Sequence, residues 1–361
     1  MKSPTALIMA GGTGGHVFPG LALARRLRRD QINVIWLGTR RGIEARLVPA
    51  ESIPVEWISI SGLRGKGALA LVAAPFRLLM ALWQSLSVMR RHRPTVVVGM
   101  GGFVSGPGGL AAWLCRRPLV IHEQNAVAGL TNRSLARFAR LVFAAFPNSF
   151  GGGIRAEVIG NPVREEFLRQ PLPEARFASR TGPIRILVIG GSQGAAKLNT
   201  TVPAALVLLA GKLVTEVKHQ AGSRWVPAAL AAYGATGARG DVVAFIDDMA
   251  AAYAWADIVI CRSGALTVSE LAAIGVAALL VPFPAAVDDH QTRNAQWLVS
   301  VGAAILVPES ELTAARLADE LQGLCADRAQ LLTMARQART LVCTDSTERL
   351  ARACERIMEA A

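Results

Sequence analysis

Three glycine-rich loops, each directly after an apolar run, most constrain what this chain can fold into. The loops are Gly11–His16, Gly101–Gly109 and Gly190–Gly194, and they follow the runs at 6–10, 95–100 and 185–189. A strand that turns through glycines into a helix points backbone N–H groups at one spot, which also receives the positive end of the helix dipole. Two such loops in the first half and one in the second predict two domains that bind phosphorylated ligands in a cleft between them.

Short apolar runs alternate with helical patterns along the whole chain, which is typical of parallel sheets built from β–α–β units. In the first half we expect strands near 6–10, 33–37, 57–60, 95–99, 119–121, 141–144 and 157–159. In the second half we expect them near 185–189, 213–218, 241–245, 257–260, 278–281 and 304–306. The proline-rich stretch at 162–183 predicts a linker between the two halves.

The positive charge of the chain is concentrated in its first half. The 361 residues carry a net charge of +13. Residues 1–160 hold 20 Lys and Arg against 6 Asp and Glu, and residues 161–361 hold 19 against 20. Either a diffuse basic surface or an anionic partner, nucleic acid or acidic lipid, explains this excess. Because no nucleic-acid motif accompanies the arginines, we favour an anionic membrane surface and expect no nucleic acid.

The cysteines and the N-terminus indicate a cytoplasmic protein. Five cysteines are scattered without a C-x-x-C pair, and histidine is sparse, so neither a zinc site nor a disulfide framework is expected. No signal-peptide pattern precedes the first expected strand.

The segment from Gly67 to Met89 is apolar and about long enough to cross a membrane. Arg77 argues against a span, because an arginine at mid-depth costs roughly 2.5–3.5 kcal/mol on insertion scales. Apolar residues recur at helical spacing and form one stripe: Val72, Phe76, Leu79, Met80, Trp83 and Leu86. The stripe either packs in a core or lies in the membrane interface with basic residues at the headgroups. In the second case Phe76, Leu79, Trp83 and Arg77 contact the membrane.

The first glycine loop almost matches a dinucleotide-binding fingerprint. Gly12-Thr13-Gly14 supplies the G-x-G, but Val17 stands where the last glycine belongs. No carboxylate follows the second strand to hold a ribose, which disfavours NAD. The loop at 190–194 lacks the Lys-Ser/Thr of a P-loop, which disfavours NTP hydrolysis.

Two polar groups stand at expected strand ends in the first half. His16 lies where the first loop enters its helix, and His122-Glu123-Gln124-Asn125 follow the strand near 119–121. His16 is either a capping or packed polar group, or a general base or diphosphate ligand. The second group either satisfies backbone or binds a ligand, since ligands of open α/β sheets bind at the carboxyl ends of strands.

A further candidate site follows the strand near 257–260. Gly264 permits a turn, and the amides of Ala265, Leu266 and Thr267 open a helix that suits a diphosphate. Glu270 either complements the helix dipole or accepts two hydrogen bonds from a ribose diol. Side-chain amides after the next strand suit sugar hydroxyls.

Together these motifs resemble the MurG family of bacterial N-acetylglucosaminyltransferases. The resemblance covers, in order, Gly11–Gly20, 62–67, Gly101–Gly109, His122–Asn125, Gly160–Arg164, Gly190–Ala195, Phe245–Met249 and Arg262–Glu270. It implies the α/β GT-B glycosyltransferase fold, with two Rossmann-like domains whose parallel sheets face an interdomain cleft. It also implies that 1–161, with a C-terminal helix at about 342–361, binds acceptor and membrane, and that 184–341 binds the UDP-sugar donor.

Carried over position by position, the resemblance implies a set of UDP-GlcNAc contacts. They are Thr13, Gly14, Gly15, Asn125, Arg164, Ser192, Ile246, Ala265, Leu266, Thr267, Val268, Ser269, Glu270 and Gln291. Asn125 and Gln291 would contact the sugar, and Arg164 the diphosphate or sugar. Ile246 would offer its backbone to uracil, and Glu270 would hold the ribose.

The implied reaction transfers GlcNAc from UDP-GlcNAc to the 4-hydroxyl of MurNAc in lipid I, with inversion, and yields lipid II. His16 is the candidate base or, alternatively, a contact to the acceptor diphosphate. No D-x-D-type metal motif is placed at the donor site, so neither a metal nor a cofactor is expected. The expected partners are UDP-GlcNAc, lipid I, an anionic membrane surface and the cell-wall synthesis machinery, at the cytoplasmic face of the bacterial inner membrane.

Two alternatives remain open at this point. A UDP-GlcNAc 2-epimerase of the same fold would need no lipid acceptor and no membrane surface. A peripheral membrane protein without catalysis would use only the basic and apolar residues of the first half. Release of UDP in the presence of lipid I separates the three.

Overall fold

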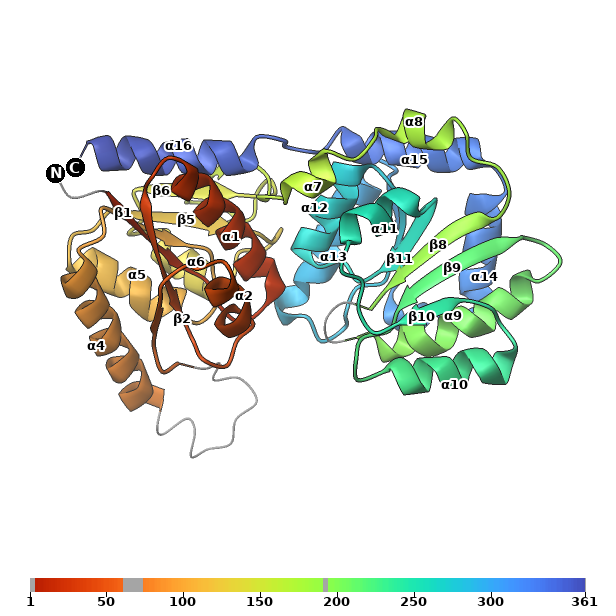
Figure 1. Cartoon of the computed structure of the whole chain (residues 1–361), viewed down its shortest axis with the longest axis horizontal. Helices are drawn as coiled ribbons and strands as arrows, with labels where there is room; N and C mark the ends of the chain where they lie inside the picture. Colours follow the sequence, from red (N-terminus) through yellow and green to blue (C-terminus); the bar gives the residue numbers. More distant parts are fainter. Residues whose placement is uncertain (1–3, 61–73, 191–193, 361) are drawn as a thin grey trace. The chain divides into compact units, whose positions relative to one another are not determined.

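The computed structural model describes residues 4–60, 74–190 and 194–360. The chain divides into two compact units, Met1–Arg164 with Cys343–Ala361, and Glu165–Val342. Each unit is built on its own parallel sheet (Figure 1). The motif at 62–67 and the candidate Ser192 lie outside the described residues.

The described residues of the first unit form a seven-stranded parallel sheet with the order β3-β2-β1-β4-β5-β6-β7. Its strands are β1 (Thr5–Met9), β2 (Asn33–Gly38), β3 (Val55–Trp57), β4 (Val96–Gly99), β5 (Leu119–Glu123), β6 (Leu141–Ala144) and β7 (Glu157–Val158). Its helices are α1 (Gly14–Arg29), α2 (Glu44–Ala50), α4 (Ala74–His92), α5 (Ser105–Leu114), α6 (Leu130–Leu135) and α16 (Ser346–Glu359). The strand order reverses between β1 and β4, so the loops after these strands flank the point where such sheets bind ligands.

The central strand β1 shows why this sheet is covered on both faces. Ala6 and Ile8 join one hydrophobic cluster, Leu7 and Met9 join another, and all four are fully buried. Successive side chains of a strand point to opposite faces, so a continuous apolar run needs helices on both sides. The last helix of the chain, α16, packs against α1 and contributes to the first of these clusters.

In the second unit the described residues form a six-stranded parallel sheet with the order β10-β9-β8-β11-β12-β13. The strands are β8 (Ile184–Ile189), β9 (Thr215–Gln220), β10 (Asp241–Val243), β11 (Ile258–Cys261), β12 (Ala277–Leu280) and β13 (Ala304–Leu306). The α-helices are α7 (Glu165–Leu168), α8 (Pro173–Phe177), α9 (Ala196–Leu209), α10 (Val226–Thr236), α11 (Met249–Trp255), α12 (Ala265–Ile274), α13 (His290–Val299), α14 (Ala314–Cys325) and α15 (Arg328–Arg339), and 3-10 turns lie at Val287–Asp289 and Glu309–Glu311. The order reverses between β8 and β11, which places the loop after β11 at the second switch point.

The stretch at 162–183, expected to be a linker, contains two short helices that pack on the second unit. Phe167 in α7 is fully buried, with its ring 5.8 Å from that of Tyr253. Arg176 in α8 donates from Nη2 to the carbonyl oxygen of Ile274 at 3.0 Å. From Glu165 onward this stretch belongs to the second unit.

Every strand expected from the sequence is present, with its ends shifted by at most three residues. The apolar segment near 67–89 contributes α4, which begins at Ala74 and ends at His92. Among the helices of residues 4–60, 74–190 and 194–360, none is long and apolar enough to cross a bilayer.

Candidate active site

The loop after β1 is held by the carboxylate of Glu44, a fully buried residue in α2. Gly12 has a φ of +94°, which glycine adopts without strain. Its amide donates to Oε2 of Glu44 at 3.0 Å, while Oε1 accepts from the amide and the hydroxyl of Thr39 at 3.0 and 2.8 Å. The amide of Gly12 therefore already has a partner within the protein. The sequence pattern missed Glu44 because this contact spans 32 positions.

The first turn of α1 contains four of the residues predicted for the site. Thr13 is the N-cap residue with an extended backbone, and its side chain makes no capping hydrogen bond to the described residues. Gly14 and Gly15 follow, in the turn where a helix leaves N–H groups without an intrahelical partner. His16 completes the turn and is half-buried. This helix start can therefore receive an anion beside an imidazole.

The loop after β4 touches the first loop through two glycines. Gly101 and Gly102 have φ values of +100° and +81°. A Cβ on Gly102 would lie 2.4 Å from the carbonyl oxygen of Gly11, and a Cβ on Gly101 would lie 2.8 Å from Nδ1 of His16. A side chain at either position would push the two loops apart, so these glycines permit the close approach as well as the turn.

His16 is connected to the end of β5 by hydrogen bonds. Its Nδ1 lies 2.8 Å from Oε1 of Gln124. The Gln124 Nε2 lies 3.0 Å from Nδ1 of His122 and 3.1 Å from the His122 carbonyl oxygen. Nε2 of His122 lies 2.9 Å from the carbonyl oxygen of Gly160. His122 is fully buried, and burial lowers its pKa to about 4.

Glu123 is a buried carboxylate that shapes the turn after β5. Its Oε1 accepts from the amide of Asn125 at 2.9 Å and from Nδ2 of Asn125 at 3.2 Å. Its Oε2 accepts from the amide of Gly129 at 3.2 Å and from Nδ2 of Asn132 at 2.9 Å. Within the motif at 122–125, Glu123 therefore satisfies local donors, and it fixes the place of Asn125.

Arg164 ends the first unit and lies beside α1. Its guanidinium lies 5.3 Å from the centre of the Phe18 ring. A cation over an aromatic face is held electrostatically, with an energy of about 0.5–2 kcal/mol. This contact places Arg164 next to the helix that carries His16.

In the second unit, α12 begins directly after β11 and Gly264 is its N-cap residue. Ala265, Leu266 and Thr267 form the first turn, as the sequence predicted. The hydroxyl of Ser263 is buried and has no hydrogen-bond partner among the described residues. Buried polar atoms nearly always have partners, so the state of this hydroxyl is unusual.

The rest of the α12 motif divides into packing residues and one acid. Val268 is fully buried, and the hydroxyl of Ser269 donates to the carbonyl oxygen of Ala265 at 2.9 Å. Val268 therefore packs in the interior, and the Ser269 hydroxyl bonds to the backbone of its own helix. Glu270, in the second turn, is 7% exposed.

The neighbouring loops of the second unit are held by Arg262 and Gln291. Arg262 forms an ion pair with Glu309, donates to the carbonyl oxygen of Val281 at 3.2 Å, and lies 5.4 Å from the Phe283 ring centre. Oε1 of Gln291 accepts from the amide of Phe283 at 2.9 Å. The sequence assigned no role to Arg262. Another candidate, Ile246, lies half-buried in the loop between β10 and α11.

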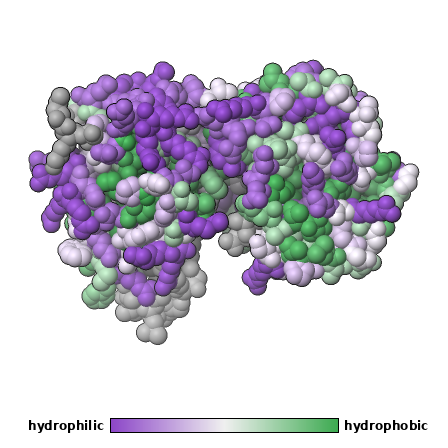
Figure 2. Space-filling model, viewed as in Figure 1, coloured by the Kyte–Doolittle hydropathy of each residue, from purple (hydrophilic) through white to green (hydrophobic). Residues whose placement is uncertain are grey.

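One face of α4 is apolar and exposed to solvent. Phe76 is 75% exposed, Leu79 64% and Trp83 68%, while Ala81 and Ser85 on another face are fully buried. The interpretation that these three stripe residues pack in a core is therefore wrong. Hydrophobic residues also reach the surface over α9 and α10 of the second unit (Figure 2), where Leu230 is 51% exposed. The two helices differ in charge, because α4 contains Arg77, Arg90 and Arg91, whereas α10 contains no arginine or lysine within its bounds.

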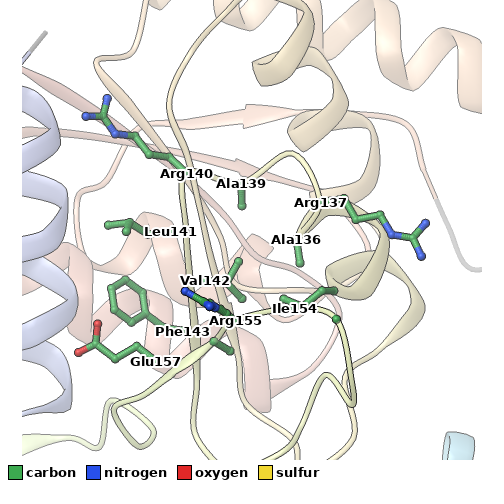
Figure 3. Close-up of a pocket in the computed structure, with 12 residues that line it drawn as sticks. Ala136, Arg137, Ala139, Arg140, Leu141, Val142, Phe143, Ile154, Arg155 and Glu157 are labelled. Atoms are coloured by element: carbon green, nitrogen blue, oxygen red, sulfur yellow. The ribbon is translucent and has the colours of Figure 1, made fainter.

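A pocket of about 670 Å³ lies at the amino ends of β6 and β7 (Figure 3). Arg137, Arg140, Arg155 and Glu157 are its charged lining residues. In Figure 3, Arg137 and Arg140 extend away from the pocket in opposite directions. The glycine loops lie at the carboxyl ends of the strands, so this pocket is at the other end of the first sheet. The pocket lining includes none of the site residues predicted from the sequence.

Two family models cover most of the chain. The N-terminal domain of glycosyltransferase family 28 matches residues 6–144, and its C-terminal domain matches residues 185–356. Two bacterial relatives carry the name UDP-N-acetylglucosamine–N-acetylmuramyl-(pentapeptide) pyrophosphoryl-undecaprenol N-acetylglucosamine transferase. That of Nitrosococcus oceani is 56% identical over 348 residues, covering 96% of this chain and 97% of the relative. That of Alkalilimnicola ehrlichii is 57% identical over 350 residues, with the same coverage.

Solved structures agree with these relatives. MurG of Acinetobacter baumannii matches with a TM-score of 0.85 at 41% identity, covering 98% of this chain and 99% of that one. A UDP-GlcNAc 2-epimerase of Neisseria meningitidis has a TM-score of 0.69 at 12% identity, and so shares the fold alone. The expected resemblance and the pair of Rossmann-like units are thus confirmed. The chain belongs to glycosyltransferase family 28 and, within it, to the MurG N-acetylglucosaminyltransferases.

Proposed function

We propose that this chain transfers GlcNAc from UDP-GlcNAc to the 4-hydroxyl of MurNAc in lipid I, with inversion at the anomeric carbon and release of UDP. The observation that carries this proposal is 57% identity over 350 residues to a transferase named for that transfer. The epimerase alternative is not favoured, because epimerases share the fold at 12% identity. A protein without catalysis is not favoured either, because the relatives of high identity are enzymes.

The second unit binds the donor in this proposal. The first-turn amides of Ala265, Leu266 and Thr267 receive the diphosphate, where the helix dipole favours negative charge. Ser263, whose buried hydroxyl has no hydrogen-bond partner in the described part of the chain, lies next to this turn in the sequence. Glu270 holds the ribose diol, and the backbone of Ile246 faces the uracil. Ser192 and Gln291 are further proposed contacts to the diphosphate and sugar.

Substitution of Glu270 by Ala tests the donor site. We expect UDP to bind about 1.5–3 kcal/mol more weakly, the range for hydrogen bonds to a charged group. Titration calorimetry with UDP measures the change, and Glu311→Ala, at an exposed acid of a surface turn, is the matched control. Equal affinity of wild type and Glu270→Ala for UDP would show that Glu270 does not bind the ribose.

The first unit supplies the base and binds the acceptor. His16 takes the proton of the MurNAc hydroxyl as the oxygen attacks the anomeric carbon, and UDP leaves with the electron pair of the broken bond. The same unit also contributes donor contacts: Thr13, Gly14 and Gly15 border the diphosphate–sugar region of UDP-GlcNAc. Asn125 contacts the sugar, and Arg164 contacts the diphosphate or sugar. The negative charge that develops on UDP is offset by helix amides, so the proposed mechanism uses no metal or cofactor.

One assay separates the proposal from its alternatives. The enzyme is incubated with UDP-GlcNAc, with and without lipid I, and both UDP and UDP-sugar isomers are measured. UDP release that depends on lipid I supports the transferase. A UDP-sugar isomer formed without lipid I would identify an epimerase. If no product formed under either condition, the chain would be a peripheral membrane protein without catalysis.

We further propose that the exposed face of α4 attaches the chain to the anionic cytoplasmic face of the plasma membrane, near the cell-wall synthesis machinery. The acceptor carries an undecaprenyl chain and resides in that membrane. Phe76, Leu79 and Trp83 would enter the interface while Arg77 meets the headgroups. Three large apolar side chains that are each more than 60% exposed support a surface that is covered in use.

Vesicle flotation tests this surface. With phosphatidylglycerol vesicles we expect Phe76→Ala combined with Trp83→Ala to lower the partition coefficient about a hundredfold or more, because each buried aromatic contributes roughly 1.5–3 kcal/mol. Leu230→Ala on α10 removes an exposed apolar side chain from the other unit and should change nothing. Equal flotation of the double variant and the wild type would exclude this face.

A further inference from the structure

We infer that His122 and Gln124 are positioning residues which hold His16 in the tautomer with the proton on Nδ1, so that Nε2 of His16 carries the lone pair. The inference deepens the proposed function and rests on it where it concerns catalysis. The hydrogen-bond geometry that carries the tautomer itself is independent of the reaction.

The inner end of the chain of hydrogen bonds fixes the His122 tautomer. Nε2 of His122 lies 2.9 Å from the carbonyl oxygen of Gly160, and a carbonyl oxygen can only accept. Nε2 must therefore carry a proton. Because burial lowers its pKa to about 4, the His122 ring is neutral near pH 7, and its Nδ1 is an acceptor.

The middle of the chain fixes the orientation of the Gln124 amide. One of its terminal atoms faces both Nδ1 of His122, at 3.0 Å, and the His122 carbonyl oxygen, at 3.1 Å. Both of these partners are acceptors, so the atom that faces them is the nitrogen. The oxygen of the same amide is then the atom 2.8 Å from Nδ1 of His16.

The outer end follows from the first two steps. An amide oxygen can only accept, so Nδ1 of His16 donates a proton to it. In the neutral ring the other nitrogen, Nε2, then carries the lone pair, which a general base needs. When Nε2 takes the proton of the acceptor hydroxyl, the Nδ1–H bond to Gln124 remains and stabilises the imidazolium. An amide does not accept that second proton, so Gln124 orients the ring without relaying a charge.

Two glycines make this arrangement sterically possible. Gly101 leaves the room that the His16 ring occupies, since a Cβ there would lie 2.8 Å from Nδ1. Gly160 has a φ of +78°, and a Cβ there would lie 2.6 Å from Cβ of Cys343. The carbonyl that anchors His122 is thus presented by a backbone conformation that favours glycine.

Nitrogen NMR of the full chain labelled with ¹⁵N-histidine tests the inference, at a pH where the rings are neutral. We expect His16 to show a protonated Nδ1 and His122 a protonated Nε2. In Gln124→Met, which removes both amide partners, His16 should shift toward the Nε2–H form, whereas Gln124→Glu retains an acceptor and should retain the Nδ1–H form. Retention of the protonated Nε2 on His122 shows that the first unit is folded, and an unchanged His219 spectrum shows the same for the second unit. A protonated Nε2 on His16 of the wild type overturns the inference even if Gln124→Met does not fold, and so does an unchanged His16 spectrum in folded Gln124→Met.

Kinetics add a readout that loss of packing alone would not produce. We expect Gln124→Met to lower kcat at least about tenfold, which is part of the roughly 10²–10⁴-fold that a general base supplies, and to leave the KM for UDP-GlcNAc unchanged. Gln124→Glu should recover part of kcat. A lower kcat with the His16 tautomer unchanged would overturn the positioning role. Failure of the proposed function looks different: the wild type would then release no UDP in the presence of lipid I, while its His16 tautomer remains as inferred. Failure of the base role alone would leave full turnover in His16→Ala.

Discussion

Each unit of this protein buries one histidine in hydrogen bonds, and the two differ in where those bonds lead. His122 and His219 are both fully buried, and burial lowers the pKa of each to about 4. In the second unit, His219 lies 3.1 Å from the hydroxyl of Tyr233 and 3.0 Å from Oδ1 of Asn199. These bonds join α9, β9 and α10 inside the unit. In the first unit the bonds continue from His122 through Gln124 to the half-buried ring of His16 at a switch point.

Burial and a neutral ring do not by themselves determine what a histidine does. It can join elements of a core, as His219 does, or it can set the orientation of a group at the surface, as we infer for His122. What decides between them is whether the last member of the network reaches a place that a ligand can occupy.

The largest effect that would break the comparison is on turnover. His16→Ala should lower kcat roughly 10²–10⁴-fold, the usual contribution of a general base, with UDP affinity unchanged. Assays with lipid I and calorimetry with UDP measure the two quantities. If turnover were unchanged, His16 would not be a base. The hydrogen bonds from His122 would then only stabilise the fold, as those of His219 do.

The next effect is the dependence of stability on pH. Each buried ring has a pKa near 4 when folded and 6.5 as its ordinary value, so the unfolded chain binds more protons between these values. Each ring then contributes stability that is complete above about pH 6.5 and is lost as the pH falls toward 4, on the order of 3 kcal/mol per ring. Urea titrations of wild type and His219→Asn at pH 7 and 5 should show a smaller loss in the variant. An equal loss in both would mean that His219 is not neutral when buried.

A smaller effect concerns the second unit alone. His219→Leu should leave Asn199 and Tyr233 without their ring partner and lower the free energy of unfolding by about 1–3 kcal/mol. Denaturant unfolding measures this loss. The folded fraction should keep the wild-type kcat, because His219 bonds to Asn199 and Tyr233, and neither of them is a proposed substrate contact. A tenfold fall in kcat with intact folding would mean that the network of His219 also supports catalysis.

Much of the fold could be predicted from local pattern. A continuous apolar run such as 6–10 indicates a strand buried on both faces, and glycines directly after it indicate a strand–loop–helix turn. The helix start at Ala265 was predicted for the same reason. The proline pattern did not reveal the two short helices within 162–183, because prolines also begin helices: Pro173 occupies the first position of α8.

The amino-acid sequence by itself determined the order of strands and helices, the glycine loops and the family, because these depend on neighbours in the chain. The tertiary structure alone decided which distant groups meet. Glu44 reaches Gly12 across 32 positions, and Gln124 reaches His16 across 108. It also decided that Trp83 faces solvent, since a stripe at helical spacing looks the same whether a core covers it or not. Hydrogen bonds and burial depend on distance in space. A sequence pattern predicts that distance only for residues that are close in the chain.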